Sequence, residues 1–143
     1  MVRAEGLHLT LCFLGPRPLE EIDPIAGALR STSRPSPRAL SLAEPVWLPN
    51  RRPKVVAVEV SDERGELGSL QAALARVLQT GGWYEPEARP FRGHVTVARI
   101  PRGERVRMAE LRAPEPVALD GARVKLYRSR PGAGGARYEV VGC

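Results

Sequence analysis

The chain has 143 residues, 22 of them basic and 16 acidic, which gives a net charge of +6. This length suits one domain, or two small lobes that share a cleft. The sequence lacks both a run of about eighteen apolar residues and a secretory signal plan, so we expect a cytoplasmic protein outside the membrane. The two cysteines, Cys12 and Cys143, fit neither a disulfide framework nor a metal-ligand spacing. The basic surplus suits a phosphate-rich partner such as RNA.

Apolar periodicity divides the chain into alternating strand patterns and helical patterns with one apolar face. Gly15-Pro16 stops the first strand, Asp23-Pro24 offers a helix start, and Gly81-Gly82 ends the clearest helix. In chain order, the expected elements are a strand at 7–14, a helix at 19–30, strands at 39–43 and 54–60, a helix at 62–80, a strand at 94–100, a short helix at 104–111, and strands at 117–119, 123–127 and 137–141.

The first expected strand carries different chemistry on its two faces. Alternation places Leu9 and Phe13 on one face and His8, Thr10 and Cys12 on the other. We therefore expect Phe13 to pack in the core rather than to stack on a nucleic-acid base, and Cys12 to be a buried thiol.

The element order after 7–14 resembles the order after 94–100, which suggests an internal duplication. A single domain spanning 1–143 would then hold two repeats, roughly 7–61 and 93–142, linked by the helix at 62–80. The second repeat is preceded by a strand and a helix, but the first is not. By symmetry we expect about thirty residues of strand plus helix before Met1, so the start is either misassigned or truncated.

Each of the two histidines is followed two residues later by one of only four threonines. The pairs are His8 with Thr10 and His94 with Thr96, and each pair shares one face of its expected strand. Two imidazoles can supply a general acid and a general base near neutral pH without a metal or a cofactor, and hydroxyls can hold phosphate oxygens. This set suits the cleavage of a phosphodiester.

Three segments resemble the 2H phosphoesterases, and most closely the RNA 2′,3′-cyclic phosphodiesterases that are also called 2′-5′ RNA ligases. They are HLTLCFLG at 8–15, RPFRGHVTVAR at 89–99, and LYRS at 126–129 with the ending GGARYEV at 134–140. The resemblance implies a bilobal α+β fold of the LigT-like type, in which two pseudo-two-fold related antiparallel sheets with outer helices enclose the active site. It also implies a strand and a helix before the first motif, which this chain lacks.

The resemblance further implies a reaction and a set of site residues. The reaction is metal-free opening of terminal 2′,3′-cyclic phosphates to 2′-phosphomonoesters, with 2′-5′ joining of RNA ends in reverse in some members. His8 matches the proton donor and His94 the proton acceptor, while Thr10 and Thr96 match the residues that hold the phosphate. Arg99 matches a phosphate-contacting arginine, although strand parity puts it on the face opposite His94.

The expected protein is a monomer that acts on RNA with 2′,3′-cyclic phosphate ends, such as tRNA fragments, without a cofactor or a metal. Two alternatives stay open. One is an RNA-binding module whose catalysis is impaired by the short N-terminus. The other is a phosphodiesterase of small cyclic nucleotides or 2′-5′ oligonucleotides.

Overall fold

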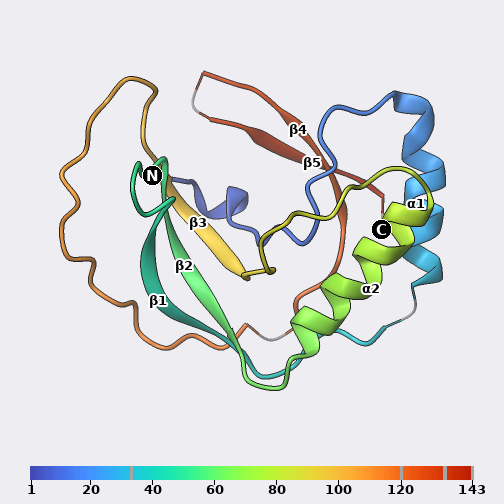
Figure 1. Cartoon of the computed structure of the whole chain (residues 1–143), viewed down its shortest axis with the longest axis horizontal. Coiled ribbons are helices and arrows are strands. Elements are labelled where there is room, and N and C mark those ends of the chain that lie inside the picture. The colour runs from blue at the N-terminus through green and yellow to red at the C-terminus, as the bar shows by residue number, and fades with distance from the viewer. Residues whose placement is uncertain (33, 120, 134, 143) are drawn as a thin grey trace.

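The computed structural model describes residues 1–32, 34–119, 121–133 and 135–142, and these form a mixed α+β fold (Figure 1). The described strands make two antiparallel sheets, one in the order β1-β2-β3 and one of β4 and β5. The mixed α+β class is therefore confirmed. The elements are α1 (Ile22–Ser31), β1 (Leu40–Leu48), β2 (Val55–Asp62), α2 (Glu66–Thr80), β3 (His94–Arg99), β4 (Leu126–Arg130) and β5 (Arg137–Gly142), with 3₁₀ turns at Ala4–Gly6 and Leu19–Glu21.

The helices lie at one end of the molecule, with α2 below the β4–β5 hairpin and α1 at its right in the view of Figure 1. Helix α2 contacts both α1 and β2, and α1 also contacts β5. The apolar face expected for α2 is buried, except that Val77 is only half-buried. The buried apolar side chains are Ile25, Ala26, Leu40, Ala57, Val58, Leu67, Leu70, Ala73, Leu74 and Leu78.

Helix α2 begins at Glu66, later than the expected start at residue 62. Asp62 ends β2, and its backbone carbonyl accepts a hydrogen bond from the N–H of Gly65, whose φ of 66° is left-handed. The Asp62 carboxylate then accepts a hydrogen bond from the N–H of Gly68 in the first turn of the helix, at 2.9 Å. A carboxylate at this place satisfies an otherwise unpaired N–H and favours the helix N-terminus.

The segment 7–14 is not a regular strand, contrary to the expectation from its alternation. A 3₁₀ turn at Ala4–Gly6 precedes it, and one antiparallel bridge joins Leu9 to Val95. A second backbone contact lies nearby, from the N–H of Val2 to the carbonyl of Val97 at 2.8 Å. Alternation reports which faces residues occupy, but continuous pairing also needs a neighbouring strand in register.

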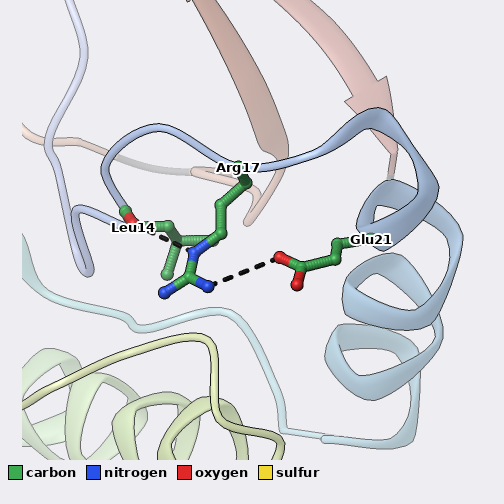
Figure 2. Close-up of polar contacts among 3 residues, drawn as sticks. All are labelled: Leu14, Arg17 and Glu21. Atoms are coloured by element: carbon green, nitrogen blue, oxygen red, sulfur yellow. Dashed lines mark hydrogen bonds and ion pairs between the residues drawn. The ribbon is translucent and has the colours of Figure 1, made fainter.

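The loop after the first motif is tied to the start of the helical segment by Arg17 (Figure 2). Its guanidinium donates one hydrogen bond to the carbonyl of Leu14 at 3.3 Å and one to the carboxylate of Glu21 at 3.5 Å. Helix α1 begins at Ile22, so Asp23-Pro24 lies within its first turn rather than before it. Proline is tolerated there because the first-turn N–H groups have no partner inside the helix.

Strand β1 is longer than expected, because residues 45–48 belong to it and not to a loop. Its register against β2 shifts by one residue between Leu42 and Pro45. A proline cannot donate to the ladder, and it is tolerated at such a bulge. The strand therefore continues through Pro45 to Trp47 and Leu48.

The segment between β3 and β4 contains no helix at 104–111, contrary to expectation. Trp47 anchors it by donating its indole N–H to the carbonyl of Ala109 at 3.1 Å. Residues 117–119 lie along β1, with one antiparallel bridge between Ala118 and Ser41, so only part of the expected strand forms. Strand β4 begins later than expected, at Leu126.

Within the described residues, neither helix offers a long apolar stretch that could cross a membrane.

Candidate active site

The two His-x-Thr motifs lie side by side and run in opposite directions. The antiparallel bridge joins their central residues, Leu9 and Val95. Because bridged residues share a face, Leu9 and Val95 point to one side and the flanking residues point to the other. His8, Thr10, His94 and Thr96 therefore share a face of this arrangement, which we call the histidine face.

The opposite side of the two motifs is apolar and fixes their spacing. A side chain at Gly93 would lie 3.0 Å from Leu67, 3.4 Å from Leu9 and 3.7 Å from Val60. These three side chains thus close over the backbone immediately before His94. A methyl group at position 93 would therefore be tighter than ordinary van der Waals contact, and the Leu67 side chain would have to shift by a few tenths of an ångström.

Both histidines make the same backbone contact. Nδ1 of His8 lies 2.7 Å from the carbonyl oxygen of Gly6, and Nδ1 of His94 lies 2.8 Å from the carbonyl oxygen of Arg92. A carbonyl can only accept, so Nδ1 carries the proton in each ring and Nε2 is left for other chemistry. Both side chains are half-buried, and Nε2 of neither ring has a hydrogen-bond partner among the described residues.

Arg99 lies on the histidine face, contrary to the expectation from strand parity. The register of β2 and β3 pairs Ala57 with Thr96 and Val56 with Ala98, which leaves Val97 as an extra residue in β3. This β-bulge reverses the alternation beyond Val97. Arg99 pairs with Val55, and Val55, Ala57 and Glu59 alternate on one face of β2. The arginine is therefore aligned with Thr96 and His94 and is exposed to solvent.

Glu59 and Arg92 form an ion pair next to His94, at the end of β3 away from Arg99. Glu59 stands opposite His94 in the β2–β3 register, and its carboxylate accepts a hydrogen bond from the guanidinium of Arg92. This hydrogen bond raises the pKa of Arg92. A hollow of about 420 Å³ continues from this pair past Phe91 and Ser61 to the start of α2. The sequence analysis did not identify Glu59 or Arg92, although Arg92 lies within the segment that resembles the second motif.

Two tyrosines of the β4–β5 hairpin lie beside His8. The ring centroids of His8 and Tyr138 are 4.2 Å apart, and those of His8 and Tyr127 are 6.3 Å apart. The sequence analysis missed both residues. The available signal was the alternation along the two strands, since Tyr127 pairs with Val140 and Tyr138 with Ser129 on one face of the hairpin.

Phe13 and Cys12 differ from expectation. The side chain of Phe13 is 72% exposed, so it is not a core residue. Cys12 is half-buried beside Gln71 and Tyr84, and burial raises the pKa of its thiol to about 11. Cys143, the other cysteine, lies outside the described residues.

The described residues contain no cluster of three or more histidine, cysteine, aspartate or glutamate side chains with the arrangement of a metal site. The donor set on the histidine face consists instead of two imidazoles, two hydroxyls and one guanidinium. Such groups can transfer protons and hold an anion.

The chain matches one known protein family and is similar to two solved structures. Residues 1–133 match the family model of the 2′-5′ RNA ligase superfamily. The chain is similar to the crystal structure of TT0787 of Thermus thermophilus, with a TM-score of 0.65 and 26% identity over 94% of this chain and 75% of that one. It is also similar to a crystal structure described as a phosphoesterase, with a TM-score of 0.69 and 26% identity over 95% of this chain and 74% of that one.

A search of curated proteins found no match. The family match and the structural neighbours support phosphodiesterase-type chemistry and confirm the expected LigT-like fold. The chain belongs to the 2′-5′ RNA ligase superfamily of 2H phosphoesterases.

Proposed function

We propose that this protein hydrolyses the terminal 2′,3′-cyclic phosphate of RNA to a 2′-phosphomonoester. The observation that carries the proposal is the equivalent anchoring of the two histidines. In each copy a backbone carbonyl holds Nδ1, and the bridge between Leu9 and Val95 places both rings on one face. Two imidazoles with available Nε2 atoms can serve as an acid and a base in one site.

In the proposed reaction, water attacks the phosphorus atom while His94 accepts a proton from it at Nε2. A new P–O bond forms and the bond between phosphorus and O3′ breaks. His8 in its protonated form donates the proton of Nε2 to the departing O3′, which leaves as a hydroxyl. The product keeps the phosphate on O2′, and the two histidines have exchanged protonation states before solvent restores them.

Thr10, Thr96 and Arg99 complete the proposed site around the phosphate. The two hydroxyls share the histidine face, and the bulge at Val97 aligns Arg99 with them. Hydroxyl and guanidinium donors stabilise charge on the non-bridging oxygens as it develops, and an arginine can contact a phosphate with two parallel hydrogen bonds. The same groups acting in reverse would join RNA ends through a 2′-5′ linkage.

The exposed ring of Phe13 supports a nucleoside substrate. It lies three residues beyond Thr10 and is 72% exposed, so its surface is available to stack on a base. Stacking on aromatic side chains is a common mode of recognition of unpaired RNA bases. Phe13 is thus the residue that we assign to the terminal base.

The test is hydrolysis of a short RNA ending in a 2′,3′-cyclic phosphate, with the phosphate position of the product determined by mass spectrometry and nuclease sensitivity. The wild type should release a 2′-phosphate in EDTA, and the pH–rate profile should be bell-shaped. His8→Ala or His94→Ala should each lower the turnover rate about 10²–10⁴-fold. Full activity of either variant would contradict the proposed function.

A panel of substrates separates the alternatives. Turnover of cyclic mononucleotides or 2′-5′ oligonucleotides in preference to a cyclic-ended RNA would identify a small-molecule phosphodiesterase. Salt-sensitive RNA binding without turnover would identify a binding module.

A further inference from the structure

The β4–β5 hairpin has two chemically different faces. Register pairs Tyr127 with Val140 and Ser129 with Tyr138 on the face that lies against His8. The alternate positions pair Arg128 with Glu139 and Arg130 with Arg137, so these side chains point to the other face. We call this other surface, defined by Arg128, Arg130, Arg137 and Glu139, the arginine face.

The arginine face is open and positively charged. Arg130, Arg137 and Glu139 are exposed, with 58% of the Arg130 side chain accessible, whereas Arg128 is half-buried. The only carboxylate of this face, Glu139, lies 3.5 Å from Arg130. Three guanidinium groups and one carboxylate leave the face with a net positive charge.

The pairing of Arg130 with Arg137 does not serve the stability of the hairpin. Like charges directly opposite each other on neighbouring strands are destabilising. A bound polyanion removes this penalty, because it places negative charge between the two guanidinium groups. The planar guanidinium also matches the oxygens of a phosphate group better than a lysine ammonium does.

We propose that the arginine face binds the ribose–phosphate backbone of the RNA, upstream of the end held on the histidine face. This inference rests on the proposed function, since one RNA chain must occupy both faces of the hairpin. The two faces belong to one layer of two strands, so an RNA chain that extends beyond the end held at His8 reaches the arginine face by passing around the hairpin edge. The preferred substrate is accordingly an oligoribonucleotide, not a mononucleotide.

The direct test is binding of a fluorescent ten-nucleotide RNA with a cyclic phosphate end, measured by anisotropy in a His94→Ala background that prevents turnover. The test variant is Arg130→Ala/Arg137→Ala. The matched control is Arg64→Ala/Arg76→Ala, which removes the same charge from exposed positions at and near α2. Loss of two contacts should reduce the slope of log affinity against log salt by about 1.4. Between about 50 and 200 mM salt, affinity should therefore fall about sevenfold less in the test variant than in the parent, and the control should behave like the parent.

Kinetics in the His94-containing protein provide the second arm. In the parent, KM should fall as the RNA is lengthened from one to ten nucleotides. In the test variant, KM should no longer depend on RNA length. The kcat/KM of the test variant for a nucleoside 2′,3′-cyclic phosphate reports whether its active site is intact. Equal RNA affinity and equal salt slope in test variant and parent would overturn the inference. Equal losses in test variant and control would also overturn it, because they would show an effect of net charge alone. Because binding is read without turnover, failure of the proposed reaction is distinguished from failure of this inference.

Discussion

The imidazole of His8 packs against the phenol ring of Tyr138, with the centroids 4.2 Å apart and the planes inclined by 56°. No aromatic ring contacts His94 in the described part of the chain. The two motifs share their sequence pattern and their Nδ1 contact, yet only His8 is held by a neighbouring ring. The hairpin thus makes the two histidines structurally inequivalent.

Replacing Tyr138 by alanine should lower kcat about tenfold while KM changes little. Aromatic pairs contribute about 0.5–1.5 kcal/mol beyond the burial of their area, and losing the ring frees His8 to rotate about its side-chain bonds. Steady-state kinetics on a cyclic-ended RNA measure the effect.

Tyr138→Phe is the matched control, because it keeps the ring and removes only the hydroxyl. It should restore most of the rate lost in Tyr138→Ala. Equal losses in both variants would instead assign the role to the hydroxyl and contradict a packing role for the ring.

The ion pair of Glu59 and Arg92 should act through the backbone beside His94. Arg92 supplies the carbonyl that holds Nδ1 of His94, and Glu59 holds the guanidinium of the same residue. Glu59→Gln should therefore lower kcat severalfold more than it raises KM, because the ring orientation matters most in the transition state. Kinetics with separate kcat and KM values test this.

Exchange of the two charges, Glu59→Arg with Arg92→Glu, is the control for the ion pair. If the pair only fixes the backbone, the exchange should recover part of the rate lost in either single variant. If Arg92 contacts the phosphate directly, the turnover rate of the exchange variant should be lower than that of either single variant.

The elements that periodicity identifies best are those whose own residues decide their structure. The apolar face of α2 is buried apart from Val77, and the run of β-branched residues in β2 forms a strand as expected, because these preferences belong to the segments themselves. The pairing of His8 with Thr10 and of His94 with Thr96 on one face also follows from the two-residue period.

The features that the sequence did not reveal depend on partners far away in the chain. The bulge at Val97 arises from the register between β2 and β3. It reverses the alternation of side chains beyond Val97, so the prediction that Arg99 lies opposite His94 was wrong. Phe13 alternates like a core residue, yet 7–14 pairs with β3 only at Leu9 in the described part of the chain, and Phe13 is left 72% exposed. The contact of Tyr138 with His8 depends on how the β4–β5 hairpin packs against the first motif, which the residues of the hairpin alone do not determine.

Gly93→Ala should destabilise the protein by about 1–3 kcal/mol, the usual cost of overpacking. The added methyl group would lie 3.0 Å from Leu67 and 3.4 Å from Leu9, so these side chains must shift by a few tenths of an ångström. Chemical denaturation measures the change. Gly68→Ala is the matched control, because its nearest neighbour is 3.7 Å away and it lies within a helix, where alanine should stabilise by about 0.5–1 kcal/mol.

Cys12 should react slowly with iodoacetamide at pH 8, because burial raises the pKa of its thiol to about 11 and the thiolate is the reactive form. The measurement uses a Cys143→Ser protein, so that one thiol is followed, and denaturant should accelerate the reaction. Rapid alkylation of the native protein at pH 8 would contradict the raised pKa.

The same shift predicts how Cys12 affects stability at alkaline pH. The folded pKa lies above the unfolded value of 9.0, so the unfolded chain releases the proton first as pH rises. The contribution of Cys12 to stability is therefore complete below about pH 9 and is lost as pH rises through about 11. Cys12→Ala should flatten the alkaline fall in the free energy of unfolding over this window.

Arg99→Ala should lower kcat/KM about 10²–10³-fold if the guanidinium stabilises the charge that develops on the phosphate. The bulge at Val97 gives this prediction a positional test. In a regular strand, residue 98 would share the face of His94, and moving the arginine there in Ala98→Arg/Arg99→Ala would restore activity. Because Val97 is an extra residue, position 98 faces the apolar side with Val95, and the exchange should give no recovery.

Deletion of Val97 checks the same geometry without placing a charge on the apolar side. Removing the extra residue leaves Ala98 opposite Val56 and Arg99 opposite Val55 in an unbroken ladder, so the arginine keeps the histidine face. The deletion should accordingly retain more activity than Arg99→Ala, with folding checked by circular dichroism. Full activity of Arg99→Ala would show instead that the guanidinium lies away from the phosphate, as it would in a regularly alternating β3.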